Sequence, residues 1–133
     1  MLNVDMKFQS AITHCFKNYG SIKGRAPRSE FWWFTLFLIL ASILMSLIDV
    51  AIFGLDRVMG EDFVFALNLS NIFMALTFIP AFTVTFRRLH DVNKSGKWLF
   101  IYLTIIGAFL ILYWNIKKGD EGENRFGSNP LIS

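Results

Sequence analysis

Ionisable side chains in this 133-residue sequence gather in two short stretches, each beside a long apolar segment. Guanidinium groups in such positions can pair with carboxylates or bind phosphate, because arginine presents a planar fork of donors that fits both. A candidate cluster for ion pairing or lipid binding therefore comprises Arg25, Arg28, Glu30, Arg87, Arg88, His90 and Asp91.

The pairing within this cluster follows from chain geometry. Two antiparallel membrane helices joined by a short loop place the start of the first and the end of the second at one depth. We therefore expect Arg87 and Arg88 to form an ionic cluster with Glu30. The two arginines that precede Glu30 should gather near Asp91. Two alternatives remain: Arg87 and Asp91 are four residues apart and could pair along one helix, or all of these groups are solvated loop charges.

Few residues in the chain suggest enzymatic or metal chemistry. His90 lies beside Asp91, but adjacent residues on a helix point apart, and no motif pairs them with a nucleophile. His14 and Cys15 are also adjacent, which is poor geometry for a shared metal ion. The single cysteine excludes an intrachain disulfide and a zinc site of the CxxC type. We predict a non-enzymatic protein with no catalytic residue, metal site or cofactor.

The large apolar fraction indicates an integral membrane protein. Hydrophobic residues make up 54% of the chain, including 15 Phe and 4 Trp, which is more than an ordinary soluble domain carries. The net charge of +3 is concentrated beside the apolar segments, so nucleic acid is not an expected partner. We predict one all-α membrane domain over residues 1–133, with about three transmembrane helices preceded by an interfacial amphipathic helix.

The amphipathic helix is predicted over residues 4–19, where apolar side chains recur at three- and four-residue steps. Asn3 or Asp5 could cap its start, and Gly20 lies where a left-handed stop is usual. We expect this helix to lie in the headgroup plane with its apolar face down. The alternative is a helix that packs on the rest of the protein.

The first membrane helix is predicted over residues 31–53. Its length is about 34 Å at ~1.5 Å per residue, enough to cross a hydrocarbon core of about 30 Å. Trp32 and Trp33 mark its interfacial end. Asp49 is an intramembrane carboxylate and so a candidate functional residue, but its position near the end of the helix favours a structural or interfacial role.

A second membrane helix is predicted over residues 63–86. Pro80 removes one backbone hydrogen bond and opposes the carbonyl of Leu76, which predicts a kink. Asn68 and Asn71 share a face and are expected to hydrogen-bond to a neighbouring helix.

A third membrane helix is predicted over residues 98–116, with Ser95 as a candidate cap and Gly107 near its middle. It would span about 25–28 Å at ~1.5 Å per residue, barely one crossing. The glycine-rich polar tail, residues 117–133, is expected to lie outside the bilayer.

The distribution of Lys and Arg predicts a cytoplasmic N-terminus. Five basic residues precede the first membrane helix, one lies in the first loop, four in the second loop and three in the tail. Three crossings would leave nine of them inside and four outside. A re-entrant third segment that folds back at Gly107 would leave twelve inside and one outside. Length favours the first arrangement and charge the second.

Three ordered motifs resemble a known family. They are GRAPRSEFWW at 24–33, RRLHDVNKSGKW at 87–98 and NRFGSNP at 124–130. Together they resemble the bacterial inner-membrane family called domain of unknown function 805, to which the YhaH-like proteins belong. The departures are Pro27, Lys97 and the absence of a proline near the middle of the third helix, which weakens the re-entrant alternative. The resemblance implies a multi-pass protein of the bacterial plasma membrane, with no established activity and no assigned catalytic residues.

The function predicted from these features is a binding or scaffold module whose basic cytoplasmic face recognises anionic phospholipid or an acidic partner. The alternative is a subunit of a small oligomeric transporter or channel, with Asp49, Asn68, Ser70 and Asn71 along a polar path. Expected partners are therefore the bilayer, a second copy or another membrane protein. An enzyme acting on a lipid or peptide would rest only on His90 and Asp91.

Overall fold

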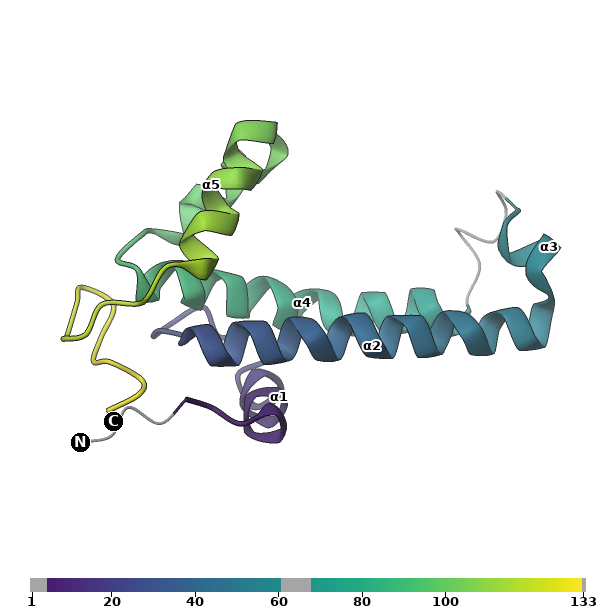
Figure 1. The fold of residues 1–133 in the computed structure, drawn as a ribbon, viewed down its shortest axis with the longest axis horizontal. Helices are drawn as coiled ribbons and strands as arrows, with labels where there is room; N and C mark the ends of the chain where they lie inside the picture. Colours follow the sequence, from purple (N-terminus) through teal and green to yellow (C-terminus); the bar gives the residue numbers. More distant parts are fainter. Residues whose placement is uncertain (1–4, 61–67, 133) are drawn as a thin grey trace.

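A computed structural model describes residues 5–60 and 68–132, and within them the chain is helical, without strands. The elements in chain order are α1 (Phe8–Lys17), α2 (Arg28–Phe53), α3 (Leu55–Val58), α4 (Leu69–Asp91), the 3₁₀ helix η2 (Gly96–Leu103) and α5 (Ile105–Ile116). Figure 1 shows α2 and α4 side by side as one long pair. Helix α1 packs on one side of this pair near one end, and α5 projects from the other side (Figure 1). The prediction of an all-α fold is confirmed.

The two long helices are apolar enough to cross a membrane, by length and composition. Helix α2 ends at Phe53 as expected but begins at Arg28, so Glu30 already lies in its first turn. Helix α4 continues through Asp91, beyond the expected end at Phe86, and the expected part at residues 63–67 lies outside the described residues. Large apolar side chains along the middle of α2 are half exposed or more, as lipid-facing residues are: Ile39, Leu40, Ile43, Leu44 and Leu47.

The carboxylate of Asp49 is buried and caps the start of α4 from the neighbouring helix. Its Oδ1 accepts a hydrogen bond from the backbone N–H of Leu69 (3.0 Å), and its Oδ2 accepts from both the N–H (2.9 Å) and the hydroxyl (2.6 Å) of Ser70. The first N–H groups of a helix lack partners within the helix and favour negative charge. This geometry corresponds to the structural role expected for Asp49. Asn68 adds the local cap by accepting from the N–H of Asn71 (2.8 Å).

Helix α1 is shorter than predicted and packs on α2. It begins after Lys7, so Asp5 does not cap it, while Asn3 lies outside the described residues, as does the predicted start at residue 4. Gly20 is not left-handed, and the helix already ends at Lys17. Ala11 and Cys15 are fully buried against the rest of the protein. Helix α1 therefore packs on the rest of the protein, as the alternative prediction had it, and its position in the headgroup plane stays a prediction.

The turn that follows α1 contacts α4 near its proline. Pro80 lacks an N–H, so the carbonyl of Leu76 loses its partner within the helix. The hydroxyl of Tyr19 donates a hydrogen bond to this carbonyl at 2.5 Å. The Thr83 hydroxyl donates to the carbonyl of Tyr19 at 3.1 Å. Pro80 thus leaves a free carbonyl on α4 to which Tyr19, in the turn after α1, is attached.

The predicted continuous helix over residues 98–116 is wrong, because the segment folds as two elements, η2 and α5. Thr104 interrupts the helix in an extended conformation, and its hydroxyl accepts from the N–H of Gly107 (3.0 Å) to start α5. A Cβ at Gly107 would lie 1.8 Å from the carbonyl oxygen of Ile101, so only glycine permits this close turn. The Trp98 and Trp114 rings meet edge to face at 5.5 Å, which shows that η2 and α5 pack antiparallel.

Candidate functional site

The candidate site lies where α2 begins and α4 ends, which we call the charged end of the helix pair. The linker before α2, the loop after α4 and the polar tail all meet there (Figure 1). Arginines on α4 and in the linker are buried rather than solvated, with exposures of 6% for Arg25, 2% for Arg87 and 0% for Arg88. Burial of a guanidinium is unfavourable unless its charge is paired and its N–H groups are hydrogen-bonded, so buried arginines are expected to have both kinds of partner.

Glu30 and Arg87 form one buried ion pair between α2 and α4. The Nη2 of Arg87 lies 2.8 Å from Oε1 of Glu30, with both side chains almost fully buried. His14 of α1 approaches the same oxygen through Nδ1 at 2.9 Å, and the Cys15 thiol donates to it at 3.5 Å. Within the described residues, Glu30 Oε2 and Arg87 Nε have no hydrogen-bond partner. The Glu30 carboxylate thus connects α1, α2 and α4. The sequence had predicted a connection between the two long helices alone.

The thiol of Cys15 is held in its neutral form. Burial raises its pKa well above the ordinary range, and the nearby Glu30 carboxylate raises it further, while Arg87 acts in the opposite direction. A thiolate is the reactive form of cysteine. Cys15 is therefore a packing residue between α1 and α2.

Asp91 forms two further buried ion pairs, one with Arg25 and one with Arg88. Arg25 Nε donates to Oδ1 at 2.9 Å, and Arg88 Nη1 donates to Oδ2 at 2.5 Å. The predicted Arg88–Glu30 pair is wrong. Consecutive residues on a helix point about 100° apart, so only Arg87 faces Glu30. Asp91 pairs along its own helix with Arg88, three residues before it, and not with Arg87.

Arg88 also holds the C-terminal end of α5. Its Nη2 donates to the carbonyls of Trp114 (3.1 Å) and Lys117, and its Nε donates to the carbonyl of Asn115 (3.3 Å). The last carbonyls of a helix lack partners within the helix and carry partial negative charge. One guanidinium thus satisfies these carbonyls and attaches α5 to α4.

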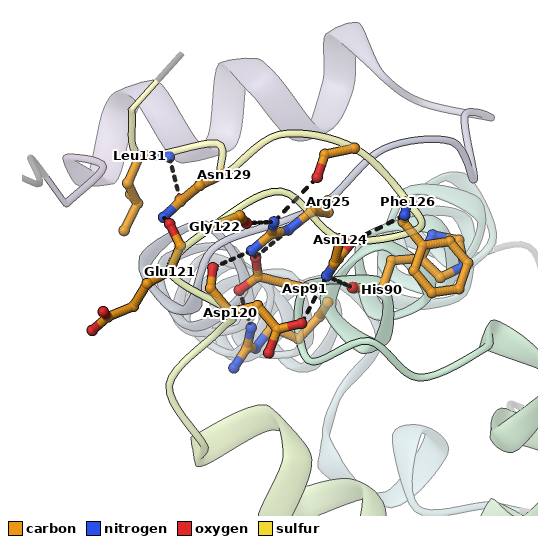
Figure 2. Close-up of polar contacts among 12 residues, drawn as sticks. Arg25, His90, Asp91, Asp120, Glu121, Gly122, Asn124, Phe126, Asn129 and Leu131 are labelled. Carbon is orange, nitrogen blue, oxygen red and sulfur yellow. Dashed lines mark hydrogen bonds and ion pairs between the residues drawn. The ribbon is translucent and has the colours of Figure 1, made fainter.

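The tail surrounds the guanidinium of Arg25 with backbone carbonyls (Figure 2). Arg25 donates to the carbonyls of Asp120 (2.5 Å), Gly122 (2.6 Å) and Gly127 (3.2 Å). The N–H of Asp120 donates to the backbone carbonyl of Asp91 at 2.9 Å. The tail is therefore part of the site, at the same end of the helix pair as the loop after α4.

His90 is part of this packing and points away from the Asp91 carboxylate. Its Nδ1 lies 3.0 Å from the carbonyl oxygen of Gly24, and its ring stacks on Phe126 with centroids 3.9 Å apart (Figure 2). Asn124 donates to the carbonyl of His90 at 3.0 Å. These contacts give His90 a role in attaching the tail. Among the described residues, no group of three or more His, Cys, Asp or Glu side chains could hold a metal ion.

Arg28 differs from the other arginines of the cluster. Its side chain is exposed, and it makes one long hydrogen bond, to the carbonyl of Ile116 at 3.5 Å. It forms no ion pair with any carboxylate of residues 5–60 or 68–132. It borders a polar cavity of about 220 Å³, which Asp91 also lines, and a cavity of about 520 Å³ beside Trp32 and Trp33. Arg28 thus lies near Asp91, as expected, without bonding to it.

Sequence reasoning missed the tail contacts and the role of Arg88 at α5. The acceptors are backbone carbonyls, which every residue carries, so residue type gives no signal for them. The motif at 124–130 was the available signal. Its Asn124 and Phe126 contact His90, within the second motif.

Comparison with known proteins finds one family model and several relatives that match most of the chain. The sequence model of the family "Protein of unknown function (DUF805)" matches residues 19–128. "Inner membrane protein YhaH" of Escherichia coli K12 is 39% identical over 117 residues, which cover 87% of this chain and 92% of YhaH. "Inner membrane protein YhaI" of the same strain is 34% identical over 115 residues, covering 86% and 89%. No solved structure matches the chain.

Proposed function

This chain belongs to the DUF805 family, whose relatives YhaH and YhaI are inner membrane proteins, and from that premise we propose that it is a non-enzymatic binding module for anionic phospholipid. The ion-paired core of the charged end holds the helices together, and exposed cations around it contact the lipid. Arg28 is the central residue of this proposal.

The observation that carries the proposal is the unpaired state of Arg28 among the described residues. Three arginines of the cluster have a carboxylate: Arg87 has Glu30, whereas Arg25 and Arg88 share Asp91. Arg28 is exposed beside Trp32 and Trp33, residues of a type enriched at the headgroup level of membranes. A phosphate group there would supply the bidentate partner that its guanidinium lacks.

The proposal includes a topology with two crossings and the charged end in the cytoplasm. The tail contacts Arg25 and Asp91, so the N-terminal linker, the second loop and the tail would share one side of the membrane. The segment formed by η2 and α5 would then be re-entrant. Twelve of the 13 Lys and Arg residues would lie on the cytoplasmic side and Arg57 on the other, in agreement with the positive-inside rule.

Native mass spectrometry of the purified protein tests the lipid proposal. The protein is offered equal amounts of phosphatidylglycerol and phosphatidylcholine, and we expect the anionic lipid to be retained preferentially. Arg28→Gln should reduce that preference about fivefold, since one cation near an anionic surface contributes about 1 kcal/mol. Arg57→Gln, at the opposite end, is the matched control and should change nothing. Equal retention of both lipids by the wild type contradicts the proposal, and binding of an acidic protein instead would point to the other class of partner.

The transporter or channel alternative has less support. Its proposed polar path used Asp49 and Ser70, and these residues bond to each other to start α4.

A further inference from the structure

An apolar groove runs between α2 and the hairpin formed by η2 and α5. It has a volume of about 440 Å³ and is lined on one side by Phe31 and Thr35 and on the other by Tyr102, Ala108 and Phe109. In a bilayer such a groove is filled by whatever apolar chain is adjacent to it, because an empty groove would forfeit dispersion contacts along its walls. The groove therefore requires an apolar occupant.

One indole separates this groove from the cavity beside Arg28. Trp32 lines both the groove and the cavity of about 520 Å³, whose other lining residues are Asp5, Arg28, Ser29, Trp33 and Ile116. Its Nε1–H donates to the carbonyl of Asn115 at 3.3 Å, which joins α2 to the end of α5. An exposed cation and an apolar groove thus lie on the two sides of Trp32. A molecule with an anionic head and an apolar chain matches this arrangement.

Asn115 supplies a second, independent observation. Asn115 is 6% exposed and lines the groove, yet its side-chain oxygen accepts no hydrogen bond from the described residues. A buried acceptor without a donor is unfavourable by about 1–3 kcal/mol. A ligand that brings a hydroxyl to this end of the groove would remove that deficit.

We infer that the groove holds one acyl chain of a phosphatidylglycerol molecule, whose phosphate pairs with Arg28 and whose glycerol hydroxyl donates to Asn115. The inference rests on the proposed function and specifies its ligand. A phosphodiester with a single negative charge matches the guanidinium of Arg28, which has no carboxylate partner among the described residues, and the glycerol headgroup provides the donor. The hairpin of η2 and α5 then serves as one wall of a lipid-binding site.

Variants that fill the groove test this inference with the full-length protein in detergent. Ala108→Phe places a ring in the groove, and we expect retention of dioleoylphosphatidylglycerol in native mass spectra to fall about tenfold. Ala75→Phe makes the same change on an exposed, lipid-facing position of α4 and should leave retention unchanged. Thr35→Phe fills the groove from the opposite wall and replaces Ala108→Phe if that variant does not fold. Wild-type retention in both groove variants overturns the inference, as does an equal loss in Ala75→Phe, which would indicate non-specific lipid.

The hydroxyl contact has its own probe. Dioleoylphosphatidylmethanol carries the same phosphodiester charge without a glycerol hydroxyl, and we expect the wild type to retain it more weakly. Equal retention of the two lipids would overturn the contact with Asn115. Failure of the groove is distinguishable from failure of the proposed function. A wild type that prefers anionic lipid but whose groove variants bind normally contradicts the groove alone, whereas a wild type without charge preference contradicts the proposed function and the groove with it.

Discussion

The hydroxyl of Tyr19 and the carbonyl oxygen of Leu76 lie 2.5 Å apart, at the point where Pro80 deprives α4 of a backbone donor. Tyr19→Phe should therefore lower the free energy of unfolding by about 1 kcal/mol, the usual contribution of one hydrogen bond. In a Pro80→Ala background the helix can satisfy Leu76 itself, so the same substitution should have a smaller effect. Chemical unfolding in detergent measures both, and equal effects in the two backgrounds would contradict the account.

Glu30 should couple energetically to Arg87 and not to Arg88. Glu30→Gln leaves the buried Arg87 guanidinium without its carboxylate, and we expect a loss of about 3–5 kcal/mol of unfolding free energy. Glu30→Arg combined with Arg87→Glu should recover part of this loss. Double-mutant cycles measure the coupling, with Arg88 as the control because it pairs with Asp91. A coupling of Glu30 to Arg88 as large as that to Arg87 would refute the assigned pairs.

Gly119→Ala should destabilise the docked tail. A Cβ there would lie 1.9 Å from Oδ2 of Asp91, and two arginines hold that carboxylate in place. We expect a loss of about 1–3 kcal/mol, typical of overpacking, together with faster tryptic cleavage after Arg125. Gly122→Ala is the matched control, since nothing lies within 4 Å of its Cβ position. Similar melting and cleavage in both variants would show that the tail is not docked as described.

The raised pKa of Cys15 predicts a stability that depends on alkaline pH. The unfolded thiol loses its proton near pH 8.5, whereas the folded thiol keeps it to higher pH, so the folded state binds more protons above that value. Stability should be unaffected by this group below about pH 8.5 and should fall above it by about 1.4 kcal/mol per pH unit. Cys15→Ala should lack this dependence. Parallel pH curves for the two proteins would mean that the thiol is not buried.

Cysteine accessibility tests the two-crossing topology. In a Cys15→Ala background, single cysteines are introduced by Ser128→Cys, Asn93→Cys and Met59→Cys, all at exposed positions. A membrane-impermeant maleimide added to intact cells should label only the Met59→Cys protein, because the tail and the second loop would face the cytoplasm. Labelling of Ser128→Cys together with Met59→Cys would instead establish three crossings.

The sequence predicted the parts of the molecule that depend on residue type. Apolar length located α2 and most of α4, and antiparallel geometry brought Glu30 to the level of Arg87 and Asp91 to the level of Arg25. Which of Arg87 and Arg88 pairs with Glu30 depends on where α4 ends, because both arginines must be helical for their side chains to point in different directions. The apolar pattern placed the end of α4 too early.

Other features were beyond prediction because they depend on backbone groups or on packing between elements. The carbonyls around Arg25 come from tail positions with no common side-chain chemistry. The turn at Thr104 depends on a hydroxyl cap and on the contact of Gly107 with Ile101, and apolar content alone does not distinguish it from a straight helix. Helix α1 has the amphipathic pattern of both interfacial and packed helices, so this pattern did not predict that Ala11 and Cys15 are buried against the rest of the protein.

The carbonyls that surround Arg25 belong to residues 120–127, which the ribosome adds after α2 and α4. Because synthesis proceeds from the N-terminus, α2 and α4 are available to pair before those carbonyls exist. The pair of long helices can thus assemble first, while Arg25 still has donors that only the tail satisfies. A variant that lacks residues 120–127 would keep its long helices but expose an arginine that the tail otherwise buries. Docking of the tail on Arg25 is therefore a step that follows the pairing of the two long helices.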